Sequence, residues 1–215
     1  VWIRKNGKLQ AAGWNDAFTA IAKAKPGASI AAIAGDMVDC ETMFAAKALL
    51  RALGSDLLEG RQTGLSYDAS NLAAVNFNTT FAGIETADAI LIIGSHVRWE
   101  APLVNVRLRK AAKRGAKVFV VGPEWDATYP TTFLGNDLAV LGKLPKDAAD
   151  AFDKAERPAL ILGGAALGKG ALGAAMSLAS KLGVVKDGWN GFNVLHMAAS
   201  RMGGLMLGYA QPGGI

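Results

Sequence analysis

The residues best suited to chemistry lie in one charged loop between Ser95 and Pro102. This loop contains a histidine, His96, an arginine, Arg98, and a glutamate, Glu100. Imidazole and carboxylate groups can transfer protons, and a guanidinium can hold an anion. The sequence, however, pairs no nucleophile with a positioned base. We therefore expect a structural hydrogen-bonding role for His96, and we expect Arg98 and Glu100 to stabilise the loop or a protein contact.

A glycine-rich run from 163 to 170 is the second candidate. It follows an apolar run and carries Lys169 at the position that the lysine occupies in a phosphate-binding loop. The next residue of such a loop must be serine or threonine to bind magnesium, and here it is Gly170. No complete G-x-G-x-x-G dinucleotide motif is present either. The sequence favours a plain strand-to-helix turn over a nucleotide site.

Metal chemistry has little support, because the chain contains one cysteine and two histidines. Cys40 alone cannot form a disulfide or supply the four thiolates of an iron–sulfur cluster. We expect it to be a small buried or half-buried side chain in the first turn of a helix that Asp39 opens. His196 lies between apolar residues, and we expect it to pack on a final helix within 192–207. Neither histidine has a metal-ligand spacing, so the sequence predicts no metal site.

Four apolar runs, each followed by a glycine, predict the strands that position the charged loop. Such runs are typical of strands buried on both faces of a parallel sheet. Between the second and third runs, Pro102 can begin a helix, which completes a strand–helix–strand crossover. Ligands bind beyond the carboxyl ends of strands in such sheets. The pattern predicts an α/β fold whose core strands are 30–34, 89–93, 118–121 and 159–162.

Composition is that of a globular protein with a sizeable core, since 51% of its 215 residues are hydrophobic and 19% are charged. No apolar run approaches the ~18 residues of a membrane span, and the start has no signal-peptide pattern. The first residue is Val1, so we expect a fragment of a longer protein. The net charge is +5. Its densest basic cluster lacks interleaved aromatics, which favours a solvated face or an acidic partner over nucleic acid: Arg107, Arg109, Lys110, Lys113, Arg114 and Lys117.

Several segments carry a family resemblance. The run Gly94, Ser95, Arg98, Glu100 to Pro102, Asn105 and 107–110 resembles the large iron–sulfur subunit of respiratory NADH:quinone oxidoreductase (complex I), within the molybdopterin oxidoreductase superfamily. Three other stretches resemble the same family: 6–9 with 14–17, which would be its entry hairpin and first helix, 78–85, and 134–137. Asn6-Gly7 is a dipeptide favoured in tight turns, so it also predicts a hairpin here. The resemblance implies Rossmann-like parallel-sheet domains, one inserted in the other. A discontinuous domain would span 1–58 plus 156–215, and the insert 59–155.

The same resemblance implies a structural segment that supports electron transfer from NADH to quinone without a redox centre of its own. The iron–sulfur clusters are expected in an amino-terminal part of the subunit that this sequence does not contain. The implied partners are other subunits of the complex, with no nucleic acid and only indirect membrane contact. The implied location is the cytoplasmic face of the bacterial inner membrane or the mitochondrial matrix side.

Departures from the molybdenum enzymes imply a lost cofactor. Their strand near residue 121 is followed by aspartate, proline and arginine, whereas Glu124 here places negative charge where phosphates would lie. The resemblance implies an empty or side-chain-filled vestigial cleft lined by Gly94, Ser95, His96, Gly122, Glu124 and Gly163. It also implies an interface or structural loop formed by Arg98, Glu100, Arg107, Arg109 and Lys110. A molybdopterin-dependent oxidoreductase domain and, less favoured, a phosphate-binding nucleotidase stay open as alternatives.

Overall fold

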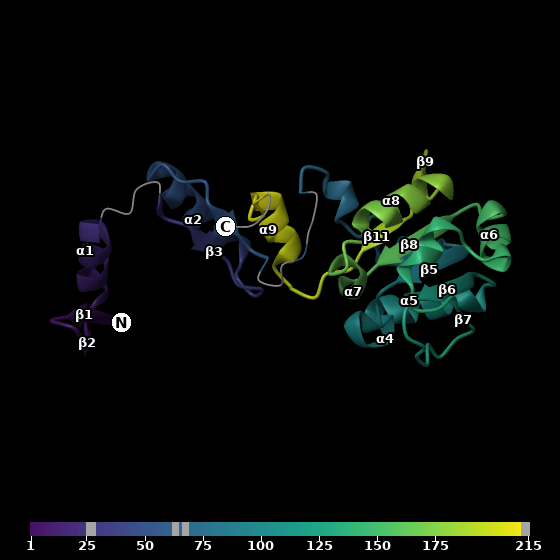
Figure 1. Ribbon diagram of the computed structural model, residues 1–215, viewed down its shortest axis with the longest axis horizontal. Helices are drawn as coiled ribbons and strands as arrows, with labels where there is room; N and C mark the ends of the chain where they lie inside the picture. The colour runs from purple at the N-terminus through teal and green to yellow at the C-terminus, as the bar shows by residue number, and fades with distance from the viewer. Residues whose placement is uncertain (25–28, 62–64, 66–68, 212–215) are drawn as a thin grey trace.

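The computed structural model describes residues 1–24, 29–61, 65 and 69–211. Figure 1 shows three groups of elements along the long axis: a hairpin with one helix, a small unit around α2 and α9, and a larger α/β unit. The hairpin consists of β1 (Trp2–Lys5) and β2 (Lys8–Ala11), and α1 (Trp14–Ala24) follows it. Asn6 and Gly7 both have positive φ, as a tight hairpin turn requires, so the predicted hairpin is confirmed.

The small unit joins the beginning of the chain to its end. Strands β3 (Ala32–Ile33) and β4 (Leu58–Glu59) pair in parallel, and α2 (Cys40–Ala52) contacts α9 (Arg201–Leu207). The Asp39 side chain accepts the N–H of Thr42 at 2.7 Å, which caps α2 as predicted. Tyr209 lies in the core of this unit with residues of α2 and β4, including Met43, Leu50 and Leu58.

The predicted core strand at 30–34 is wrong in length and burial. Only Ala32 and Ile33 form a strand, and Ile33 is 66% exposed. Its partner in the described chain, β4, is itself only two residues long. A pair of such short strands cannot cover both faces, so the apolar composition of this run did not lead to a buried sheet strand.

The larger unit is built on a five-stranded parallel sheet in the order β11-β8-β5-β6-β7 (Figure 1). Three predicted core strands are confirmed in it as β5 (Ala89–Ile93), β6 (Lys117–Val121) and β8 (Pro158–Leu162). The edges are the short strands β7 (Thr132–Phe133) and β11 (Phe192–Val194). Each predicted run is almost wholly buried, as strands covered on both faces must be.

Helices cover both faces of this sheet, and alternate side chains of each strand point to opposite layers. Leu91 and Ile93 pack with α6 (Lys146–Asp153) and α8 (Leu172–Lys181), whereas Ile90 and Ile92 pack with α4 (Val97–Glu100) and α5 (Pro102–Lys113). The remaining elements are η2 (Leu72–Ala74), α3 (Thr80–Gly83), η3 (Ile84–Thr86), η4 (Leu138–Gly142), α7 (Gly164–Leu167), β9 (Val185–Lys186) and β10 (Trp189–Asn190). The predicted α/β class is confirmed.

Strand pairing joins parts of the chain that lie far apart in sequence. Strand β8 pairs with β5 along its whole length, from Ala89 with Pro158 to Ile93 with Leu162. Residues 158–194 therefore share a sheet with strands of 59–155, because their apolar side chains complete both faces of one core. Ser200, α9 and the described residues after α9 return to the unit formed by 29–61. Domain boundaries as such stay a prediction.

The predicted helix over 192–207 is wrong in its first part. Phe192–Val194 forms edge strand β11 against β8, and α9 begins only at Arg201. His196 lies in the connection between them, and its Nε2 lies 2.6 Å from the Val75 carbonyl oxygen. At 192–194 the backbone forms hydrogen bonds with the open edge of β8. The spacing of apolar residues in this segment does not reveal that such an edge is available.

Candidate functional site

The candidate site lies where the direction of strand order reverses. From β5 the chain proceeds to β6 and β7 on one side, and then to β8 and β11 on the other. In open α/β sheets the crevice for a ligand lies at this point, beyond the carboxyl ends of the strands. Gly94 directly follows β5 and Gly163 directly follows β8, so the reversal brings these two predicted residues together.

Backbone packing fills the space between the two glycines. A Cβ atom on Gly163 would lie 2.4 Å from the Cβ of Ser95 and 2.5 Å from the carbonyl oxygen of Gly94. A Cβ on Gly94 would lie 2.5 Å from the amide nitrogen of Ala166 in α7. Gly94 also has a φ of +60°, which favours glycine. The loop after β5 and helix α7 therefore meet at backbone contact distance.

The amides of the three glycines that follow these strands are already bonded. Gly94, Gly122 and Gly163 each donate to a backbone carbonyl of a neighbouring segment, at 2.8, 2.9 and 2.9 Å. Leu167 and Gly168 donate to the carbonyl oxygens of residues 163 and 164, which closes the helical turn α7. Anion sites in phosphate-binding loops depend on N–H groups that point at the ligand. Here the N–H groups of the three glycines form backbone hydrogen bonds within the protein.

The charged loop forms the short helix α4, and Glu100 organises its start. The Glu100 carboxylate accepts the Ser95 hydroxyl at 2.6 Å and the backbone N–H of His96 at 3.2 Å. Arg98 points instead to Asp126, donating to its carboxylate at 2.8 Å and to its carbonyl oxygen at 3.0 Å. Arg98 and Glu100 thus have separate structural partners.

The described contacts of the His96 side chain are aromatic, whereas the sequence predicts a hydrogen-bonding role. Its ring stacks on Trp125, with centroids 4.7 Å apart, and meets the edge of Trp99 at 6.1 Å. Its Nδ1 is buried without a hydrogen-bond partner in the described part of the chain. This placement follows from the loop after β6, which brings Trp125 over the imidazole.

The basic cluster on α5 gathers around one acidic residue, Glu85 of η3. The Glu85 carboxylate accepts hydrogen bonds from Arg107 and, at 3.1 Å, from Lys110, while an Arg114 nitrogen lies 3.8 Å away. Hydrogen bonds from Arg107 and Lys110 lower the pKa of Glu85 below its ordinary value. Of the predicted interface residues, Arg107 and Lys110 are brought together here, and Arg109 is exposed elsewhere on the helix.

Sequence reasoning missed the segment after β6. Trp125 and Asp126 hold His96 and Arg98, and the Tyr129 hydroxyl donates to Asn105 of α5 at 2.9 Å. Burial raises the pKa of Tyr129 above its ordinary value of 10. No local spacing links these residues to their partners, so only the βαβ crossover itself could have predicted that this loop faces α4 and α5.

Similarity to known proteins extends over almost the whole chain. The molybdopterin oxidoreductase family profile matches residues 2–215. The chain belongs to the molybdopterin oxidoreductase family. It is similar to the G subunit of NADH-quinone oxidoreductase of Rickettsia prowazekii, with 38% identity over 97% of this chain and 32% of that protein. It is also similar to the mitochondrial 78 kDa subunit of NADH-ubiquinone oxidoreductase of Neurospora crassa, with 34% identity over 98% of this chain and 30% of that protein. The chain spans about a third of the length of these relatives.

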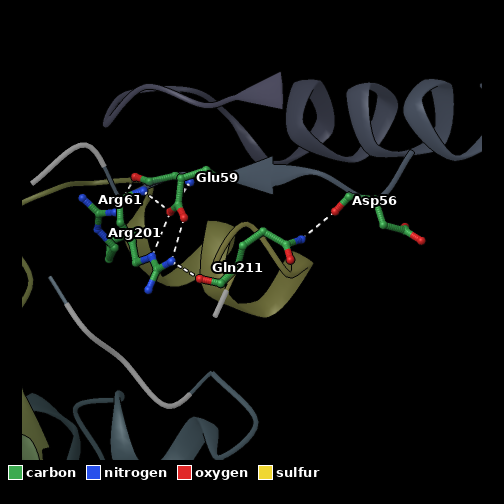
Figure 2. A network of polar contacts seen from close by, with 6 residues as sticks. Asp56, Glu59, Arg61, Arg201 and Gln211 are labelled. Atoms are coloured by element: carbon green, nitrogen blue, oxygen red, sulfur yellow. Dashed lines mark hydrogen bonds and ion pairs between the residues drawn. The ribbon is translucent and has the colours of Figure 1, made fainter. Parts of the chain in front are cut away.

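Within this family member, a second polar cluster joins α9 and the residues after it to β4 (Figure 2). Arg61 donates to both carboxylate oxygens of Glu59, at 2.8 and 2.6 Å, and both side chains are only 10% exposed. Burial alone would raise the pKa of Glu59, but hydrogen bonds from Arg61 and from the amide of Gly60 lower it below 4.5. Arg61 also donates to the Gln211 carbonyl oxygen.

Two more contacts complete this cluster. Gln211 donates through its side chain to the Asp56 carbonyl oxygen at 2.6 Å. Arg201, which is 5% exposed, donates to Asp36 at 3.0 Å and to the Gly60 carbonyl oxygen. The cluster therefore fixes the end of the chain against the unit formed by 29–61, which is a structural role.

Metal ligands and membrane spans are not found among the described residues of this family member. No group of three or more His, Cys, Asp and Glu side chains in the described ranges could hold a metal ion. Cys40 is exposed, contrary to expectation, because the first turn of α2 faces solvent, and its Sγ lies against Gly203 of α9. Burial lowers the pKa of His196. None of the helices formed by the described residues is long and apolar enough to cross a membrane.

Proposed function

We propose that this chain is a structural segment of the peripheral-arm iron–sulfur subunit of NADH:quinone oxidoreductase. In this role it supports electron transfer from NADH to quinone that centres elsewhere in the complex carry out. The similarity to the bacterial G subunit and to the mitochondrial 78 kDa subunit over nearly the whole chain supports this assignment. The complex is the enzyme, and this segment is non-catalytic.

The observation that carries the non-catalytic assignment is the packed switch point. A pterin dinucleotide is held through its phosphates by free backbone N–H groups at strand ends. Here the glycine amides bond to neighbouring carbonyls, and a Cβ at Gly94 or Gly163 would already clash with backbone. Exposed Glu124 after β6 adds a negative charge that repels phosphate. Gly94, Ser95 and Gly163 thus serve packing, and the Gly122 amide bonds to the Gly135 carbonyl oxygen.

The partners in this proposal are other subunits of the complex. Arg98, Glu100 and the basic face of α5 would stabilise the loop or make contacts with these subunits. The iron–sulfur clusters would lie in another part of the full-length subunit, and membrane contact would be indirect, at the cytoplasmic face of the bacterial inner membrane or at the matrix side. Nucleic acid has no place in this role, since the basic helix lacks the stacking aromatics that single strands require.

The test uses the full-length protein purified within its complex. Metal analysis should find iron without stoichiometric molybdenum, and oxidised extracts should lack pterin fluorescence. A crystal soaked with a guanine dinucleotide should show no ordered nucleotide near Gly94 and Gly163. Stoichiometric molybdenum or pterin would instead support the molybdopterin-dependent oxidoreductase. A thermal shift with a magnesium nucleotide would support the nucleotidase.

A further inference from the structure

The outer face of α4 and α5 carries large apolar side chains that no described residue covers. On α5, Val104, Leu108 and Ala111 face the sheet and are buried. Leu103 and Val106 lie on the opposite side and are 71% and 51% exposed. Helix α4 packs against α5, and its Trp99 is 79% exposed. Single exposed apolar residues are ordinary, but three within eight residues on adjoining helices form a patch.

The carboxyl-terminal half of the same face is cationic. Positions three and four residues apart lie on the same helix face. Val106 therefore shares a face with Lys110 and Lys113, and Leu103 shares a face with Arg107 and Arg114. Between residues 97 and 114 the chain has six arginines and lysines and one acid, Glu100. The Glu100 carboxylate already accepts hydrogen bonds from Ser95 and His96 at the start of α4. The face therefore pairs an apolar half with a strongly positive half.

Part of the positive charge is held in place in advance. Glu85 is only 12% exposed and fixes Arg107 and Lys110 on the surface of α5. A single carboxylate cannot neutralise these cations together with Arg114. Arg109 and Lys113 are exposed and have no ion pair within the described ranges. Fixed charges lose less side-chain entropy when a partner binds, which favours recognition.

We propose that this face docks a segment of another subunit that combines apolar side chains with aspartates and glutamates. The proposal rests on the proposed function, because it names the surface through which this segment meets its complex. Charge complementarity selects an acidic partner, and the aliphatic half selects a protein, since phosphate backbones offer nothing for leucine and valine to bury against.

Charge reversal tests the proposal in the full-length protein. Arg109→Glu combined with Lys113→Glu should reduce co-purification with the other subunits of the complex about tenfold or more at physiological salt. Lys181→Glu combined with Lys186→Glu is the matched control, because it makes the same charge change on α8 and β9, outside α4 and α5. The control should co-purify like wild type. Both variants should melt within a few degrees of wild type, since all four side chains are exposed.

Photo-crosslinking identifies the occupant. A benzoylphenylalanine at position 103 or 106 should capture, in the intact complex, a peptide of another subunit with Asp or Glu beside apolar residues. The same group at position 185 is the control. Wild-type protein that fails to join the complex would overturn the proposed function as well. Normal assembly of the charge-reversed variant, or capture of lipid or of a basic peptide, would overturn only this docking surface.

Discussion

The carboxylate of Asp88 accepts the backbone N–H of Arg157 at 3.0 Å, and the Asp88 N–H donates back to the Arg157 carbonyl oxygen at 3.3 Å. The same carboxylate accepts the Glu156 N–H at 2.7 Å. These bonds connect the starts of β5 and β8. Asp88→Ala should lower the free energy of unfolding by about 1 to 3 kcal/mol in urea titrations, because it removes bonds to a charged acceptor. Asp88→Asn keeps one acceptor oxygen and should lose less. Equal stability of wild type and both variants would contradict this role.

Gly163→Ala should destabilise the chain by about 1 to 3 kcal/mol, the usual cost of overpacking. The added methyl would lie 2.4 Å from the Ser95 Cβ and 2.5 Å from a backbone oxygen, neither of which can move freely. Gly173→Ala is the control, because nothing lies within 4 Å of its Cβ position on α8, and it should be neutral or slightly stabilising. Urea unfolding measures both, and an unchanged Gly163→Ala variant would show that the switch point is open.

Acid should weaken the contact between β4 and the end of the chain. The pKa of Glu59 is below 4.5 in the folded chain, so the unfolded chain binds a proton more readily. The contribution of Glu59 is therefore fully present above about pH 4.5 and is lost as the pH falls through the folded pKa. In Glu59→Gln, stability should fall less steeply between pH 5 and 3 than in wild type, measured by urea unfolding at each pH. Parallel pH profiles would contradict the prediction.

Arg98→Gln should change folding by less than about 1 kcal/mol, because its ion pair with Asp126 is largely exposed. The same variant, and Glu100→Gln, should reduce assembly of the full-length protein into its complex, with quinone reduction falling in proportion to the assembled fraction. Native gels and activity of the assembled fraction separate the two effects. Full assembly with lost electron transfer would instead indicate a direct chemical role for these residues.

Sequence information predicted the elements whose signal is local. The buried runs that became β5, β6 and β8, the turn at Asn6 and Gly7, and the helix start at Pro102 depend on neighbouring residues alone. The errors arose where residues distant in sequence determine whether a segment forms a strand and how deeply it is buried. The exposed Ile33 depends on the short partner β4, and β11 exists because β8 offers an open edge.

The same reasoning applies to the candidate site. The position of the charged loop at a strand end followed from the βαβ pattern, whereas its partners did not. The stacking of His96 on Trp125 spans 29 positions, and the ion pair of Arg107 with Glu85 spans 22. The closeness of Gly94 and Gly163 needs the strand order, in which β8 lies beside β5 although β6 and β7 intervene in sequence.

Tyr209 has a consequence for the order in which a nascent chain acquires structure. It is 1% exposed, and its hydroxyl donates to the Met43 carbonyl oxygen at 2.6 Å, across 166 residues. During translation, α2, β3 and β4 leave the ribosome long before this side chain. Until Tyr209 is made, Met43 and Leu58 lack one of the residues that bury them. The five-stranded sheet is complete at Val194, so it can fold first. Of these two units, the one that is synthesised earlier is then the last to complete its core, and its apolar surface is exposed to chaperones in the meantime.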